Sequence, residues 1–203
     1  MAKYYGINGE KAVLNKLRNA MKAAGQKYSI RVGIIGEKAY EKSSGTDLTN
    51  AQLGAVHEFG ADIPVTDKMR AYLHYNGIHL KKETTHIKIP MRSFLRDTLL
   101  NNPQIKEQIL QDAGLYGDKD IDENLILNKI AAGDTQIMDK IADAIGSEAL
   151  KYVQEAFMSS GFGKWPPITE YTKRRRKNDK TSPPLQDGGD LLDSITFEVK
   201  KLG

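Results

Sequence analysis

Residues 194–201 read SITFEVKK, and this stretch decides the fold that the sequence predicts. Its apolar residues Ile195, Phe197 and Val199 alternate with polar ones, which is typical of a strand with one buried face. Residues 28–35, YSIRVGII, are rich in β-branched residues and predict a second strand. Pairing between these two strands would join both ends of the chain in one α+β domain, with helices packed on a small antiparallel sheet.

The helices that cover this sheet are predicted from apolar residues at helical spacing. The clearest pattern runs from about residue 134 to about residue 158. Further helices are predicted at residues 13–24, 51–60, 91–100, 104–110 and 169–177, and within residues 117–133. Thr49 or Asn50 is expected to cap the helix at 51–60, and Asn102 to cap the segment that begins with Pro103.

Residues 61–89 are predicted to be an insertion in the single domain of residues 1–203, because the helical spacing of apolar residues gives way there to segments typical of strands and a turn. RAYLHY and IHLKKET flank Asn76-Gly77, the dipeptide that best tolerates the positive φ angles of a type I′ turn. The insertion is therefore predicted to be a projecting β-hairpin that turns at these two residues. The following THIKIP, residues 85–90, adds another strand or an extended lead-in.

The composition is that of a globular protein, with 39% hydrophobic and 28% charged residues in a chain of 203. The absence of cysteine excludes disulfides, cysteine nucleophiles and thiolate metal sites. No window approaches the run of about 20 apolar residues that crosses a bilayer. The first residues lack the apolar core of a secretory signal. We therefore expect no membrane partner.

The net charge of +4 is unevenly distributed along the chain. Basic residues dominate the first 31 positions, acidic residues dominate residues 112–148, and residues 159–193 form a loop-rich basic segment. That segment contains the cluster Lys173, Arg174, Arg175, Arg176 and Lys177. Such runs are usually solvated faces, but they also suit neighbouring copies or nucleic acid. Few aromatic residues interleave with the cluster, so nucleic acid is expected to be a secondary partner.

No catalytic motif is complete in the sequence. His57-Glu58 resembles the start of a zinc-protease HExxH motif, but alanine stands where the second histidine is required. His74, His79 and His86 fall in the predicted hairpin without a suitably spaced carboxylate, so solvent-facing histidines are favoured over a metal site. The chain also lacks a phosphate-binding P-loop and a GxSxG nucleophile elbow. We expect no cofactor, no metal and no enzymatic activity.

Four segments occur in an order that is more specific than any one of them. They are LGAVHEFGA (53–61), IPMRSFLRDTL (89–99), GKWPPITEYTKRRRK (163–177) and PPLQDGGDLLDSITFEV (183–199). This order resembles the phage virion-morphogenesis family, which includes the Mu-type tail-completion proteins and related neck and tail-terminator subunits. The sequence departs from the family pattern at Ser93, where proline is usual, and at Gly188, where threonine is usual. The insertion at residues 61–89 is also longer than in compact members.

The resemblance implies a compact α+β subunit that forms a ring, expected to be hexameric, at the tail end of the head–tail junction. Its work would be to end growth of the tail tube and to present a surface to the neck. The implied partners are other copies of the chain, the tail tube protein and neck or connector proteins, in a virion assembled in the bacterial host cytoplasm. Candidate contact residues are Asn76, Gly77, Arg92, Arg96 and the cluster from Lys173 to Lys177. The alternative for Arg92 and Arg96 is that they only solvate the outside of a helix.

Two alternative functions stay open at this point. A DNA-packaging or minor head protein would use the basic cluster at residues 173–177 to bind nucleic acid. A hydrolase or metal enzyme would use the histidines of residues 61–89. Ring assembly needs binding faces rather than a reaction, which agrees with the incomplete catalytic motifs and the uneven charge.

Overall fold

The structure is a computed structural model that describes residues 27–112, 134–176 and 183–202, together with Asn15, Asn19, Asn128, Lys129 and Ala132. The strands are β1 (Lys27–Ile34), β2 (Ala61–Pro64), β3 (His86–Ile89) and β4 (Ile195–Leu202). The helices are α2 (Asn50–Phe59), α3 (Asp67–Tyr75), α4 (Pro103–Asp112), α6 (Thr135–Met158), α7 (Glu170–Arg175) and α8 (Asp190–Asp193). A 3₁₀ turn, η1 (Glu37–Ala39), and a π-helical turn, η2 (Arg96–Leu100), complete the described elements. The fold is α+β, as predicted.

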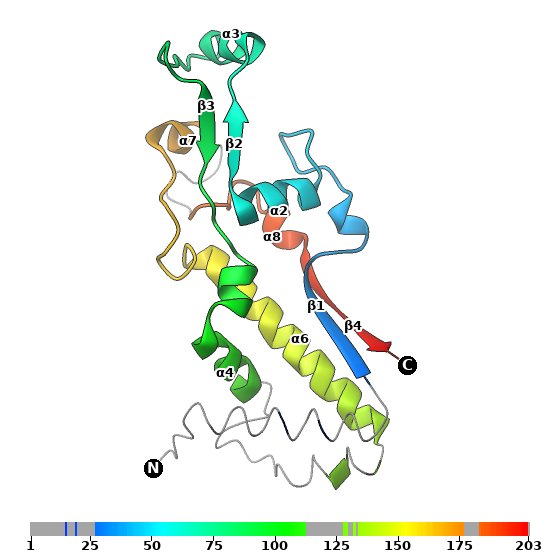
Figure 1. The fold of residues 1–203 in the computed structure, drawn as a ribbon. Coiled ribbons are helices and arrows are strands. Elements are labelled where there is room, and N and C mark those ends of the chain that lie inside the picture. The colour runs from blue at the N-terminus through cyan, green and yellow to red at the C-terminus, as the bar shows by residue number, and fades with distance from the viewer. Residues whose placement is uncertain are drawn as a thin grey trace.

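β1 and β4 form the antiparallel pair that the sequence predicts, with Ile34 opposite Ile195. Side chains alternate along each strand, so the apolar residues of both strands share one face of the sheet. That face packs on α6 (Figure 1). On the opposite face Arg31 forms an ion pair with Glu198 at 2.7 Å, as expected for the solvated side of a half-buried sheet.

α6 confirms the amphipathic pattern predicted between residues 134 and 158. Asp134 caps the helix, because its carboxylate accepts the backbone N–H groups of Gln136 and Ile137. Gly146 faces the sheet in the middle of the helix. A Cβ at that position would lie 2.4 Å from Cδ2 of Phe197, so glycine allows helix and sheet to approach closely.

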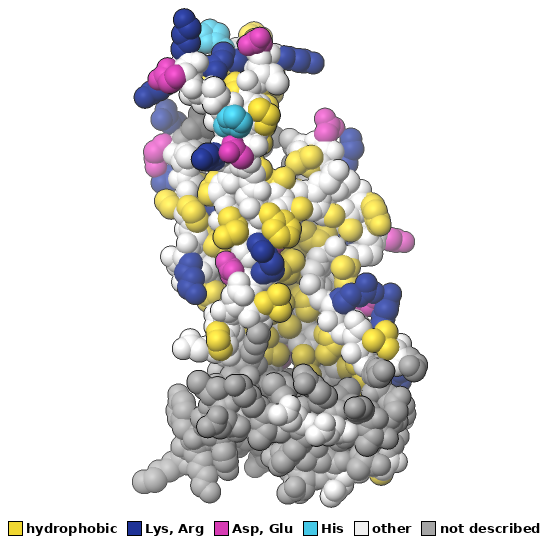
Figure 2. Space-filling model, in the orientation of Figure 1, with side chains coloured by type: hydrophobic (Ala, Val, Ile, Leu, Met, Phe, Trp, Pro, Cys, Tyr) yellow, Lys and Arg dark blue, Asp and Glu magenta, His cyan; other side chains and the backbone are white. Residues whose placement is uncertain are grey.

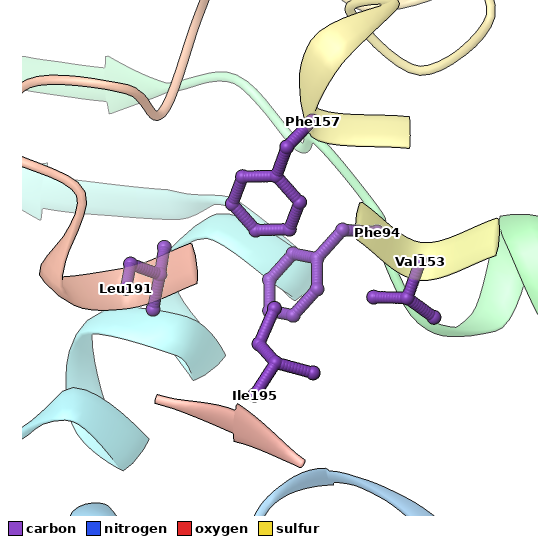
Figure 3. Packing of buried hydrophobic residues seen from close by; sticks show 5 residues of the cluster. All are labelled: Phe94, Val153, Phe157, Leu191 and Ile195. Carbon is purple, nitrogen blue, oxygen red and sulfur yellow. The ribbon is translucent and has the colours of Figure 1, made fainter. Parts of the chain in front are cut away.

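The centre of the core is built by α6 together with segments that carry the sequence motifs. Phe94, Val153, Phe157, Leu191 and Ile195 form one buried cluster (Figure 3). The ring centroids of Phe94 and Phe157 lie 5.0 Å apart, in a tilted contact that aromatic pairs favour. Residues that mark the motifs in the sequence therefore first serve to hold the fold together.

Residues 61–89 form a projecting arm, in which β2 and β3 pair antiparallel and α3 lies at the far end (Figure 1). Ala61 lies opposite Ile89 and Pro64 lies opposite His86. The strand predicted at THIKIP is confirmed as β3. RAYLHY, however, is the C-terminal part of α3 and not a strand. The prediction of a hairpin that turns at Asn76-Gly77 is therefore wrong.

Asn76-Gly77 ends a helix instead of turning a hairpin. Gly77 has a φ of 79°, and its N–H donates to the carbonyl of His74 at 3.0 Å. The N–H of Ile78 donates to the carbonyl of Leu73 at 2.8 Å. These two bonds form a Schellman motif. A type I′ turn and a Schellman motif both need a positive φ that glycine adopts without strain, so the dipeptide alone does not distinguish them.

The remaining helix predictions are confirmed in part. Thr49 is the cap that α2 uses, since its side chain accepts a backbone N–H at 3.3 Å, and Asn102 caps α4 as predicted. Of residues 91–100, only η2 is helical, because the chain before it is held in a turn by a buried carboxylate. The helices predicted at residues 13–24 and within 117–133 fall almost entirely outside the described residues.

Candidate functional site

Glu58 is the buried acceptor that organises the turn before η2. Its side chain lies near the end of α2 and the residue is 4% exposed. The carboxylate accepts the hydroxyl of Ser93 at 2.7 Å and the backbone N–H of Phe94 at 2.9 Å. It also accepts the backbone N–H groups of Leu95 and Arg96, each at 3.0 Å. Glu58 thus joins the HEFG segment to the RSFLR segment and has a structural task.

Arg96 lies at the surface but is fixed by contacts within its own chain. Its Nε–H donates to the Glu58 carboxylate at 3.1 Å, and its Nη2 donates to the Glu58 carbonyl at 3.2 Å. The guanidinium carbon lies 4.4 Å from the centroid of the Phe59 ring, a cation–π contact. The Met91 sulfur lies 3.9 Å from Nη2 of Arg96. Phe59 is 61% exposed and Met91 is 49% exposed. We call Phe59, Met91 and Arg96 the Phe59–Arg96 patch.

The patch lies where the arm joins the body, because Phe59 ends α2 just before β2 and Met91 follows β3. Figure 2 shows hydrophobic side chains gathered on the face below the arm, whereas Lys, Arg and His side chains gather toward the tip of the arm. Exposed apolar groups beside a fixed arginine make this face a candidate contact surface.

Arg92 is placed differently from Arg96, although both were candidate contact residues. Arg92 is only 7% exposed. Its guanidinium donates to the Pro166 carbonyl from Nε at 3.2 Å and from Nη2 at 3.0 Å, and its backbone N–H donates to the His57 carbonyl at 2.8 Å. Arg92 therefore connects α2, which its backbone contacts, to the WPP segment, which its side chain contacts, inside the molecule. It neither solvates a helix nor offers surface to a partner, and we withdraw it as a contact residue.

His57 is held neutral beside Arg92. Burial, and to a lesser degree the nearby Arg92 guanidinium, lower the pKa of His57 to about 4. The imidazole Nδ1 is buried and has no hydrogen-bond partner among the described residues. A protonated imidazole here would meet a second positive charge in a poorly solvated place, so the neutral ring is the stable form at pH 7.

The basic cluster at residues 173–177 is not one continuous surface in the described part of the chain. Lys173 forms an ion pair with Glu170 at 2.6 Å. Arg176 is buried, and its Nη2 donates to the Pro183 carbonyl at 2.9 Å. Arg174 is exposed. The Arg175 side chain and Lys177 lie outside the described residues.

All four motif segments border one cleft of about 540 Å³. Among the residues that line it are His57, Pro90, Arg92, Ile168, Arg176 and Asp187. Among the described residues, no serine or threonine of the cleft is hydrogen-bonded to His57, so the geometry forms no nucleophile–base pair there. Asp190, at the cleft wall, accepts the backbone N–H of Ser44 at 2.7 Å, and hydrogen bonding from the Ser44 side chain, followed by this N–H, lowers the pKa of its carboxyl group.

The tip of the arm exposes two tyrosines that the sequence reasoning did not single out. No residue of α3 is buried, and Tyr75 is 89% exposed with Tyr72 beside it on the same helix. Arg70 fixes α3 to the following loop by donating to the carbonyls of Lys81 at 2.9 Å and Thr84 at 2.6 Å. The two tyrosines are three positions apart in the sequence. This spacing places them on one face only if the segment is a helix, and the sequence predicted a strand there.

The candidate turn residues keep an exposed position at this tip. Asn76 and Gly77 are both exposed, and the Asn76 amide donates to the Tyr72 carbonyl at 2.8 Å. Their local task is to end α3, which leaves the neighbouring tyrosines as the larger surface for a partner.

Comparison with known proteins assigns no family. No protein-family sequence model matches the chain, and neither a curated protein nor a solved structure matches it. Within the described residues, none of the helices combines the length and the apolar character needed to span a membrane.

Proposed function

We propose that this protein is a structural subunit of a phage virion, which assembles into a ring and completes the tail at the head–tail junction. The observation that carries the proposal is the Phe59–Arg96 patch. An arginine is fixed from inside the subunit while an aromatic ring and a methionine are left exposed around it. The order of the four motifs in the sequence is the reason that we assign this contact surface to tail completion rather than to another assembly role.

The composition of the patch favours contact with another protein. Aromatic residues, methionine and arginine are enriched at protein interfaces, and arginine and aromatic residues are frequent among those that contribute most to affinity. Because Glu58 already holds Arg96, binding a partner would cost less side-chain entropy than ordering a free arginine. In a ring of identical subunits, each patch contacts a different surface of the next copy.

The arm gives the subunit a means of reaching a neighbour or a partner such as the tail tube or neck protein. Its tip is bonded internally through Arg70 and the Schellman motif, so it extends from the body as an ordered unit. Tyr72 and Tyr75 provide aromatic surface there at low entropic cost.

The polar residues of the motifs support a binding role rather than catalysis. Glu58 and Arg92 are engaged mainly with backbone groups, and these hydrogen bonds position segments of the fold. The division of the basic cluster, with Lys173 paired and Arg176 buried, gives little support to nucleic-acid binding as the main task.

Light scattering coupled to size-exclusion chromatography, with electron microscopy of the peak, tests the proposal on the full chain. We expect a discrete ring, either free or on purified tail tubes. The double substitution Phe59→Ser and Met91→Ser is expected to give folded monomers. Tyr40→Ser is the matched control, because Tyr40 is an exposed aromatic residue outside the patch. A monomer both alone and with tail tubes would refute ring formation, and equal loss in the control would refute the patch.

A further inference from the structure

His74 and His79 form a pair of contacting imidazoles at the tip of the arm. His74 lies in the last turn of α3 and His79 in the loop that follows. Their Nδ1 atoms are 2.9 Å apart, with the ring centroids at 4.6 Å and the ring planes at 68°. Both side chains are exposed, so solvent has access to the pair.

The contact between two Nδ1 atoms requires a particular arrangement of protons. One ring must carry its proton on Nδ1, and the other must present the Nδ1 lone pair to it. When the donor ring instead carries its proton on Nε2, both rings stay neutral and both Nδ1 atoms offer a lone pair. Neutral imidazole nitrogen is a preferred ligand of zinc, copper and nickel ions.

We propose that His74 and His79 bind one divalent transition-metal ion, of the class of Zn²⁺, Ni²⁺ or Cu²⁺, through their two Nδ1 atoms. With metal–nitrogen distances of about 2.0 to 2.1 Å in tetrahedral geometry, the two nitrogens would lie about 3.3 Å apart. The two nitrogens therefore need to separate by only about 0.4 Å from the 2.9 Å of the hydrogen-bonded pair, and the rings need to turn so that both lone pairs converge on the ion.

The backbone between the two histidines is already fixed in the conformation that brings them together. The Gly77 N–H bonds to the His74 carbonyl, and the Ile78 N–H bonds to the Leu73 carbonyl. Arg70 holds the loop beyond His79 to α3. An ordered backbone reduces the entropy that metal binding has to overcome.

The site would have two protein ligands and open positions. Within the described residues, no third His, Asp or Glu joins the pair, so water or an external group would complete the coordination. A bound ion would connect the end of α3 to the loop at residues 78–85 and stiffen the surface that carries Tyr75. This inference is independent of ring formation.

Isothermal titration of ZnCl₂ and NiCl₂ into the full chain, free of any affinity tag and treated with chelator, tests the site. We expect one ion per chain and weaker binding as the pH falls, because protons compete for the same nitrogens. Changes in the surroundings of a ligand already cost about 10- to 100-fold in metal affinity. His74→Gln and His79→Gln, which remove a ligand, are expected to cost at least as much.

His86→Gln is the matched control. His86 is also exposed and lies on the same arm, but its Nδ1 faces the Thr85 hydroxyl at 3.1 Å and not another histidine. This variant is expected to bind the ion as the parent does. Absence of binding in the parent, retained binding after substitution of both paired histidines, or equal loss in His86→Gln would each overturn the proposal. Chromatography of the same samples reports the oligomeric state separately.

Discussion

Glu58 holds both the backbone and the side chain of Arg96: its carboxylate accepts the Arg96 backbone N–H at 3.0 Å and the guanidinium Nε–H at 3.1 Å. One buried carboxylate therefore sets the course of the chain before η2 and the direction of an exposed guanidinium. A buried acceptor with this many donors is difficult to replace, because each donor left without a partner carries a desolvation cost.

Glu58→Gln is expected to lower the free energy of unfolding by roughly 3 kcal/mol, because the amide NH₂ would face backbone donors. Urea denaturation at pH 7 measures the change. Glu37→Gln is the control, since Glu37 is exposed, and is expected to stay within about 0.5 kcal/mol of the parent. Equal stability of Glu58→Gln and the parent would show that the carboxylate is not the organising group.

His57 predicts a pH dependence whose sign follows from its low pKa. The ring is neutral in both states above about pH 6.5, the ordinary value for the unfolded chain. Below pH 6.5, His57 binds a proton in the unfolded state, whereas in the folded state it stays neutral until about pH 4. Across this window the free energy of unfolding should fall by up to about 3 kcal/mol.

Unfolding curves of the parent and His57→Gln at pH 7 and pH 5 isolate this contribution, because the other titrating groups are common to both proteins. The parent should lose more stability than the variant on acidification. Parallel pH profiles would mean that His57 is not held neutral in the folded protein.

Gly146→Ala tests the contact between α6 and the sheet. Alanine favours a helix over glycine by about 1 kcal/mol, yet the added methyl group would lie 2.4 Å from the Phe197 ring. We expect a net destabilisation of about 1 to 3 kcal/mol from overpacking. In a Phe197→Leu background the same substitution should cost less, and a double-mutant cycle by urea denaturation measures the difference. A stabilising Gly146→Ala would contradict the packing described here.

Removal of the arm tip should separate assembly from folding. Replacing residues 65–85 by Asn-Gly would join Pro64 to His86, which are already paired. α3 has no buried residue, so the body should keep its Tm within about 3 °C. Assembly on tail tubes, measured by co-sedimentation, is expected to be lost. A shortened protein that fails to fold would show that the arm contributes to the core.

The sequence predicts those parts of the fold in which local period and burial agree. Apolar residues alternate along β1 and β4 and recur at helical spacing along α6. In each element these residues lie on the face that is buried. The prediction of a hairpin turn in the arm was wrong because Asn76-Gly77 suits a helix end as well as a hairpin turn. The contact role first assigned to Arg92 failed for a different reason: charged residues are usually exposed, and only the tertiary fold brings the Pro166 carbonyl to its guanidinium.

The site was the least predictable part of the molecule. Nothing near Glu58 in the sequence indicates that its carboxylate meets the backbone of residues 94–96. The exposure of Phe59 and Met91 is likewise invisible in the sequence, because large apolar residues of these types are most often buried. Such relationships depend on contacts between distant segments, whereas periodicity reports only on the local chain.

The pairing of Ile34 with Ile195 has a consequence for how the protein is made. β1 leaves the ribosome well before its partner strand, because Arg31 and Glu198, which pair across the two strands, are 167 residues apart in the sequence. Ile195 also completes the buried cluster around Phe94. A nascent chain consequently stays without its central sheet and a full core until β4 has been synthesised. A chain truncated before β4 is therefore expected to be recognised as unfolded and degraded.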